Sequence, residues 1–253
     1  MRKLRHAFGV FALILLLAVP AIPAQAEDLI VSAAASLTNA FDVVKKSFEA
    51  AHPGVTVVTN YGASGALLKQ MESGAPVDVF ASADQKTMDQ AVDKKLVQPA
   101  TRRDFVRNGL VLVVPADSRL GLKTERDLAL PSVARIALGN PETVPAGRYT
   151  QESLAAAGLW DALKPKYIMG SNVRQVLDYV TRGEVDAAFV FSTDAQQAGA
   201  KVRVVQEMAT TTPALYPVAC TTSGTKPAAR AFVDFLSSAE GQRILGAFGF
   251  RKP

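Results

Sequence analysis

The sequence has very few of the residues on which many enzymes and metal sites depend. Its 253 residues include one cysteine and two histidines. The single cysteine, Cys220, excludes an intramolecular disulfide, and its apolar neighbours at 216–220 predict a buried, unreactive thiol. A Ser-His-Asp triad would have to use His52, and a zinc site would lack ligands. We therefore expect a protein that is not an enzyme and that binds no metal ion through its own side chains.

The first 26 residues have the pattern of a secretory signal peptide. Basic residues at positions 2–5 precede an apolar stretch at 10–19, and a small-x-small motif follows at 24–26. A retained membrane anchor is the alternative, but the apolar stretch is shorter than the roughly 20 residues that a span requires. No cysteine lies near the cleavage site, so we expect no lipid anchor there. We expect residues 1–26 to be removed and the remainder to reside in the periplasm.

The charge of the chain gives no sign of a nucleic-acid partner. The net charge is +5, and residues 1–26 contribute three of the positive charges and no acidic residue, which leaves +2 for the rest. We find no block of basic residues and no interleaving of basic and aromatic residues. We therefore expect no binding to nucleic acid.

Apolar runs and amphipathic stretches alternate along the chain. This alternation is typical of parallel βαβ units and predicts an α/β fold. The remaining length exceeds the usual size of one domain, roughly 100–150 residues, so we expect two lobes. The predicted strands start at Ile30 and continue at 55–59, 77–81, 110–114, 135–138, 166–169, 186–191, 202–205 and 216–221.

Four places combine a strand end, small residues and a helix start. They are centred on Ser36, Ser64, Ala146 and Val173. The first amides of a helix lack partners and carry partial positive charge, so an anion can bind there without a charged side chain. Ligands of open α/β sheets also collect at the carboxyl ends of strands. Each site taken alone could be ordinary helix capping, but together the four favour an anion site.

Other candidate residues have simpler interpretations. The segment 62–65 lacks the second glycine of a nucleophile elbow, and no nucleotide-binding glycine motif occurs. We expect Asp78 and Asp84 to cap helices or face solvent rather than to bind a metal. Arg148 and Arg174 lie just inside predicted helices and could add positive potential, but we expect both to project into solvent.

Four motifs together resemble the periplasmic molybdate-binding proteins, which deliver molybdate to an ABC-type importer. They are Ala33-Ala-Ala-Ser-Leu-Thr-Asn-Ala40, Gly74-Ala-Pro-Val-Asp-Val-Phe-Ala-Ser-Ala-Asp84, Pro141-Glu-Thr-Val-Pro-Ala-Gly-Arg-Tyr149, and the closing Ala239-Glu-Gly-Gln and Gly249-Phe250. The motifs occur in the family's order over essentially the whole chain after residue 26. The final motif is common among binding proteins generally, whereas the first two are more specific.

The resemblance implies a two-lobed type II periplasmic-binding-protein fold with a ligand cleft between the lobes. By analogy, lobe one comprises 27–108 plus 221–253, and lobe two comprises 109–220. The strands that cross between the lobes are then expected near 110–114 and 218–221, which are apolar in this sequence.

The resemblance also assigns five ligand-binding positions. Ser36 and Ser64 are expected to supply hydroxyls and amides, and Ala146 and Val173 to supply amides. The family's fifth position is usually a tyrosine whose hydroxyl reaches the anion, but here it falls on Phe191. Phenylalanine cannot donate this hydrogen bond, whose loss would cost roughly 1.5–3 kcal/mol if nothing compensates.

Either the ligand shell has one fewer donor, or another group, such as Tyr149 or a water molecule, replaces the missing hydroxyl. The implied function is reversible capture of molybdate, and of tungstate, by a monomer that needs no cofactor and that hands the anion to a membrane permease. A binding protein for sulfate or phosphate is the nearest alternative. A secreted hydrolase using Ser64 and a receptor sensory module are more distant alternatives.

Overall fold

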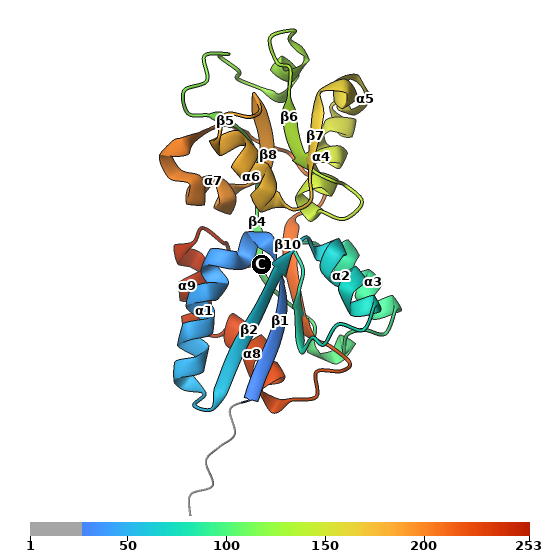
Figure 1. Ribbon diagram of the computed structural model, residues 1–253, viewed down its shortest axis with the longest axis vertical. Coiled ribbons are helices and arrows are strands. Elements are labelled where there is room, and N and C mark those ends of the chain that lie inside the picture. The colour runs from blue at the N-terminus through green and yellow to red at the C-terminus, as the bar shows by residue number, and fades with distance from the viewer. Residues whose placement is uncertain (1–26) are drawn as a thin grey trace, which may run out of the picture.

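The computed structural model describes residues 27–253, which form two α/β lobes stacked along the long axis of the molecule (Figure 1). Residues 1–26, and with them the expected signal peptide, lie outside the described residues. The expected α/β class and the division into two lobes are confirmed by the presence of two separate five-stranded sheets.

The sheet of the first lobe is built around three parallel strands. Its strands are β1 (Glu27–Ala34), β2 (Val55–Gly62), β3 (Val79–Ala81), β4 (Arg103–Asn108) and β10 (Ala214–Cys220). Their order is β2-β1-β3-β10-β4, in which β1 runs parallel to β2 and β3, and β10 runs antiparallel to β3 and β4. The parallel strands are mostly apolar because helices cover both faces of the sheet.

The sheet of the second lobe repeats this arrangement. Its strands are β5 (Leu110–Pro115), β6 (Ile136–Gly139), β7 (Tyr167–Gly170), β8 (Ala187–Phe191) and β9 (Val202–Glu207). Their order is β7-β6-β8-β5-β9, with β6 parallel to β7 and β8, and with β5 antiparallel to β8 and β9. Each lobe therefore presents the carboxyl ends of its parallel strands toward the other lobe (Figure 1).

Helices cover both faces of each sheet. In the first lobe, α1, α8 and α9 pack together on one side and α2 and α3 on the other, while α6 and α7 lie opposite α4 and α5 in the second lobe (Figure 1). Among residues 27–253, no helix has the length and apolar composition that are needed to cross a bilayer. The helices are α1 (Thr38–Ala51), α2 (Ser64–Glu72), α3 (Gln85–Asp93), α4 (Pro145–Ala156), α5 (Trp160–Leu163), α6 (Val173–Thr181), α7 (Ser192–Ala198), α8 (Pro227–Ser237) and α9 (Ala239–Ala247). Short 3-10 turns are η1 (Ala35–Leu37), η2 (Pro99–Thr101), η3 (Glu125–Ala129), η4 (Lys164–Lys166) and η5 (Gly199–Lys201).

The chain crosses between the lobes twice. It first passes from β4 to β5 at Gly109, and it returns through residues 208–213 between β9 and β10. The expected end of lobe two at residue 220 is wrong for residues 214–220, because β10 pairs with β3 and β4 of the first lobe. Apolar composition marks this segment as a strand, but it does not specify which of two sheets the strand joins.

The apolar face of α1 holds the first lobe together. Its buried residues include Phe41 and Phe48, at the spacing that an amphipathic helix requires. The ring of Phe48 meets the rings of Phe232 and Phe235 edge-on, with centroids 5.1 and 5.6 Å apart. Such aromatic pairs add to the hydrophobic stabilisation that comes from burial.

We predict that Phe48→Ala lowers the free energy of unfolding by about 3–5 kcal/mol, because it removes a fully buried ring and leaves a cavity. Urea denaturation measures this loss. The matched control is Val43→Ala on the exposed side of the same helix, which should change stability by about 0.5 kcal/mol or less. Similar losses for the two variants would contradict the packing described for α1.

Candidate functional site

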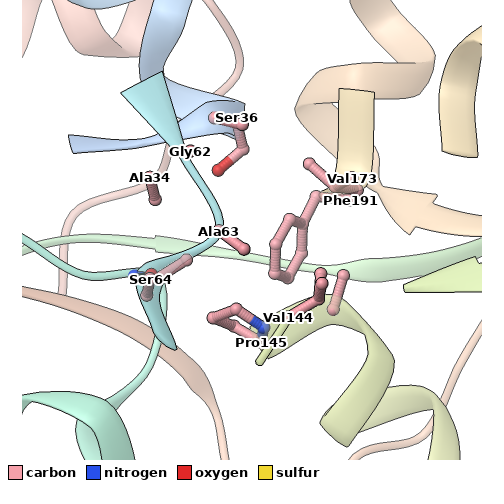
Figure 2. A pocket seen from close by; sticks show the side chains of 12 residues that line it. Ala34, Ser36, Gly62, Ala63, Ser64, Val144, Pro145, Val173 and Phe191 are labelled. Atoms are coloured by element: carbon pink, nitrogen blue, oxygen red, sulfur yellow. Dashed lines mark hydrogen bonds between the residues drawn. The ribbon is translucent and has the colours of Figure 1, made fainter. Parts of the chain in front are cut away.

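A small pocket lies between the lobes, where the starts of several helices face one another (Figure 2). Its volume is about 10 Å³, far below the roughly 300–1,000 Å³ of pockets for organic ligands. A pocket of this size suits a ligand of only a few atoms. The lining residues are Ala34, Ala35, Ser36, Gly62, Ala63, Ser64, Ala83, Val144, Pro145, Ala146, Val173 and Phe191.

All five residues predicted for the ligand site line this pocket. Ser36 lies in η1 directly after β1, and Ser64 is the first residue of α2 after β2. From the second lobe, Ala146 lies in the first turn of α4, Val173 begins α6, and Phe191 ends β8. The structure brings these segments together because parallel strands end at the same edge of each sheet.

The hydroxyl of Ser64 is oriented by the backbone of its own lobe. Its Oγ accepts a hydrogen bond from the backbone N–H of Ala83 at 3.0 Å. A backbone N–H can only donate, so the hydroxyl proton of Ser64 remains available for a ligand. The side chain is completely buried, which keeps this geometry fixed.

Two backbone amides of the second lobe are also available. The side chain of Asn172 caps α6 by accepting from the amides of Arg174 and Gln175, at 2.9 and 3.1 Å. The amide of Val173, the first residue of that helix, takes no part in this cap and has no partner within the helix. Ala146 follows the proline that starts α4, so it carries the first amide of that helix.

The pocket is lined by neutral residues alone, within the part of the chain that the structure describes. In residues 27–253, no three His, Cys, Asp or Glu side chains form a group that could hold a metal ion. Any negative charge in the pocket would therefore be met by hydroxyls, amides and helix dipoles.

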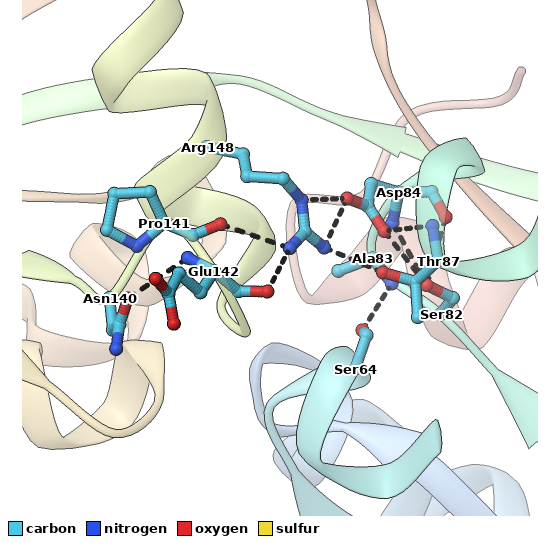
Figure 3. A network of polar contacts seen from close by, with 9 residues as sticks. All are labelled: Ser64, Ser82, Ala83, Asp84, Thr87, Asn140, Pro141, Glu142 and Arg148. Atoms are coloured by element: carbon cyan, nitrogen blue, oxygen red, sulfur yellow. Dashed lines mark hydrogen bonds and ion pairs between the residues drawn. The ribbon is translucent and has the colours of Figure 1, made fainter. Parts of the chain in front are cut away.

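Arg148 does not project into solvent as expected, because it forms a buried ion pair between the lobes (Figure 3). Its Nη2 and Nε lie 2.6 and 2.7 Å from Oδ2 of Asp84, and Nη2 also donates to Oγ1 of Thr87 at 2.6 Å. Asp84 caps α3, as its position in the sequence predicted, by accepting from the amide of Thr87. The partner of Arg148 is 64 residues away in the sequence. No local pattern could have identified it.

The expectation that Arg174 projects into solvent is also wrong, because its side chain pairs with a carboxylate of its own lobe and contacts the backbone of the other lobe. Its Nε lies 2.8 Å from Oδ1 of Asp194, and its Nη2 donates to the backbone carbonyl of Ser36 at 3.2 Å. The Nε–H does not point at the carboxylate, so the contact with Asp194 is an ion pair without a hydrogen bond. Complete burial raises the pKa of Asp194 to about 6, against the opposing effects of Arg174 and the Phe191 amide. Both arginines near the pocket thus have a carboxylate beside them.

The backbones of the two lobes touch at one edge of the pocket. The amide of Gly65 donates to the carbonyl of Thr143 in the other lobe at 3.0 Å. A Cβ at position 65 would lie 2.8 Å from this carbonyl oxygen and 2.9 Å from the Cα of Thr143. Only glycine allows the lobes to approach this closely.

Tyr149, one of the groups that could replace the missing hydroxyl, lies beside Phe191 but is not among the residues that line the small pocket. The ring of Phe191 lies between the rings of Tyr149 and Tyr216, at centroid distances of 6.2 and 5.6 Å. Tyr149 lines a second, larger cavity of about 660 Å³ and not the small pocket. Tyr216 is fully buried, and its hydroxyl lies 2.9 Å from Oγ of Ser36. Sequence reasoning missed Tyr216 because it is 180 residues from Ser36.

Comparisons with known proteins agree with this architecture. Residues 29–251 match the family described as bacterial extracellular solute-binding protein. The chain is 39% identical to the molybdate-binding protein ModA of Escherichia coli, over 87% of each chain. It is also 39% identical to a putative ABC transporter substrate-binding lipoprotein, YvgL, of Bacillus subtilis, over 88% of this chain and 85% of the relative. The solved substrate binding domain of a putative molybdenum ABC transporter from Clostridium difficile is similar with a TM-score of 0.68 and 38% identity, over 89% of this chain and 99% of that one.

The buried carboxyl of Asp194 gives a prediction about pH. The folded protein holds a proton on Asp194 up to about pH 6, whereas an unperturbed aspartate releases it near 3.8. Between these values the folded state binds more protons than the unfolded state, so the stability that Asp194 contributes falls as pH rises. We predict that the free energy of unfolding, taken relative to Asp194→Asn, decreases by about 3 kcal/mol between about pH 4 and pH 6 and is then constant.

Urea denaturation at a series of pH values measures this difference. The control variant is Asp161→Asn, at an exposed position. The difference in the free energy of unfolding between the wild type and this control should show no comparable decrease over the same pH range. A difference from Asp194→Asn that is constant or increases over the same range would contradict the raised pKa.

Proposed function

The chain belongs to the family of bacterial extracellular solute-binding proteins, and we propose on this basis that it captures molybdate and delivers it to an ABC importer. Two observations support this ligand. The ModA relative from Escherichia coli is named a molybdate-binding protein, and the similarity covers 87% of both chains. The small pocket between the lobes also offers donors that suit a compact anion.

The composition of the pocket is the observation that carries the proposal. Molybdate is a tetrahedral dianion that only accepts hydrogen bonds, and the pocket meets it with hydroxyls and amides and no charged side chain. Hydrogen phosphate would bring a proton that needs an acceptor, and the described lining has no carboxylate to provide one. Tungstate has the same charge and shape, so the site should bind it as well.

Binding requires no covalent step and no cofactor. Ser36 and Ser64 approach the anion from the first lobe, and the amides of Ala146 and Val173 approach it from the second. An anion held by both lobes favours their contact, and this contact is what a transporter can sense. The units that move are then residues 27–108 with 214–253 and residues 110–207. The chain bends between them at Gly109 and at 208–213.

The protein works in the periplasm as a monomer, after removal of residues 1–26. The membrane permease of the importer receives the protein in the conformation in which the two lobes are in contact. Phe191 closes the pocket as an apolar wall, and the donors around it supply the binding energy.

Thermal unfolding with added anions tests the ligand. We predict that molybdate and tungstate raise the melting temperature at micromolar concentrations, because a ligand at 100 times its Kd stabilises the folded state by about 2.7 kcal/mol. Sulfate and phosphate at the same concentrations should give no comparable shift. Stabilisation by sulfate or phosphate without a response to molybdate would refute the proposed ligand.

Gly65→Ala tests whether contact between the lobes contributes to binding. The added Cβ would clash with the backbone of Thr143, and overpacking of this kind costs about 1–3 kcal/mol. We predict roughly a tenfold loss of molybdate affinity by titration calorimetry, with little change in the melting temperature of the free protein.

The matched control for this variant is Gly246→Ala in α9, where a Cβ would meet nothing within 4 Å. The control should bind molybdate as tightly as the wild type does. Unchanged affinity in Gly65→Ala would mean that the anion binds without the lobe contact seen at Thr143.

A further inference from the structure

We propose that Tyr216 is a positioning residue for the anion, because its hydroxyl donates to Ser36 and thereby directs the hydroxyl proton of Ser36 into the pocket. Tyr216 is not among the residues that line the pocket, and it is not one of the ligand positions expected from the sequence. The inference rests on the proposed function and extends it to a residue that does not itself touch the ligand.

The amide group of Asn108, at the end of β4, has a fixed orientation. Its Oδ1 accepts from the backbone N–H of Gly109 at 2.9 Å and from the hydroxyl of Ser192 at 2.8 Å. A backbone N–H can only donate, so this contact identifies Oδ1 and fixes the orientation of the amide group. The other atom of the group, Nδ2, must therefore face Tyr216 and Thr193.

The two protons of Nδ2 have one acceptor each. Nδ2 lies 2.9 Å from Oγ1 of Thr193 and 3.2 Å from the hydroxyl oxygen of Tyr216. Since Asn108 donates in both contacts, the oxygen of Tyr216 is an acceptor toward Asn108. Its own proton must then point elsewhere.

Ser36 is the acceptor of this proton. Tyr216 is completely buried, and a buried hydroxyl requires a hydrogen-bond partner. Among residues 27–253, the other side-chain oxygen bonded to the Tyr216 hydroxyl is Oγ of Ser36 at 2.9 Å. Burial also raises the pKa of Tyr216 well above its usual value, so the phenol keeps its proton.

The consequence is a directed chain of hydrogen bonds from Asn108 through Tyr216 to Ser36. Because Ser36 accepts from Tyr216, its own proton is free to point at a ligand, as the proton of Ser64 is beside Ala83. Hydrogen bonds arranged head to tail polarise one another, and a bond to an anion gains most from this.

The neighbouring aromatic ring protects the chain of hydrogen bonds. The ring of Phe191 packs edge-on against Tyr216, with centroids 5.6 Å apart, and lies in the pocket wall (Figure 2). It separates the phenol from the pocket while leaving Ser36 exposed to the ligand. Phe191 has no hydroxyl to offer the anion. The phenol of Tyr216, whose ring packs against Phe191, contributes instead by acting through Ser36.

A double-mutant cycle on molybdate affinity tests this role. The four proteins are the wild type, Tyr216→Phe, Ser36→Ala and the double variant, each measured by titration calorimetry. We expect Tyr216→Phe to weaken binding roughly tenfold in the wild-type background, the order of one hydrogen bond to a charged group. In the Ser36→Ala background, the same substitution should change affinity less than about twofold, because the group through which it acts is gone.

The controls separate this inference from the proposed function and from a packing effect. Tyr149→Phe removes a hydroxyl on the other side of Phe191 and should leave affinity unchanged. Equal losses in both backgrounds, or no loss in either, would overturn the role of Tyr216. A wild type that binds no molybdate would instead refute the proposed function.

Neutron diffraction of wild-type crystals with molybdate tests the same point if Tyr216→Phe does not fold. We expect the deuterium of Tyr216 to lie toward Ser36 and the deuterium of Ser36 to lie toward the anion. A Ser36 deuterium that points at Tyr216 would overturn the inference.

Discussion

The proposed function depends on one electrostatic constraint, which is that the pocket between the lobes is lined by groups that carry no net charge and would have to hold a small anion away from water. Hydroxyl and amide protons can do this only if each donor is prevented from turning toward another acceptor. Ala83 constrains Ser64 in this way, and the cap at Asn172 occupies the two amides that follow Val173. Orientation of the donors is therefore settled by the fold before any ligand arrives, which lowers the cost of binding.

The same constraint explains why the arginines near the pocket do not enter it. Arg148 is paired with Asp84 and Arg174 lies beside Asp194, so each positive charge has a carboxylate partner. An unpaired arginine in the pocket would attract any small anion through its charge. Because each arginine is paired with a carboxylate, the two side chains contribute contacts between the lobes instead. These contacts run from Arg148 to Thr87 and from Arg174 to the carbonyl of Ser36.

The sequence allowed prediction of the local parts of this site but not of its long-range contacts. Ser36, Ser64, Ala146 and Val173 were identifiable because each stands where a strand passes into a helix, and the structure places all four around one pocket. That they bind the anion remains a proposal. Tyr216 could not be found, because its bond to Ser36 spans 180 residues and its sequence neighbours show only a buried strand. The same limit explains the misplaced β10 and the solvent exposure wrongly expected for the two arginines, whose carboxylate partners follow no local spacing rule.

The central claim is that neutral donors from both lobes hold the anion. A crystal structure with molybdate, located by the anomalous signal of molybdenum, tests it most directly. We expect the anion between the lobes, with its oxygens within hydrogen-bonding distance of the hydroxyls of Ser36 and Ser64 and of the amides of Ala146 and Val173. An anion in direct contact with an arginine or lysine side chain, or bound outside this pocket, would contradict the account.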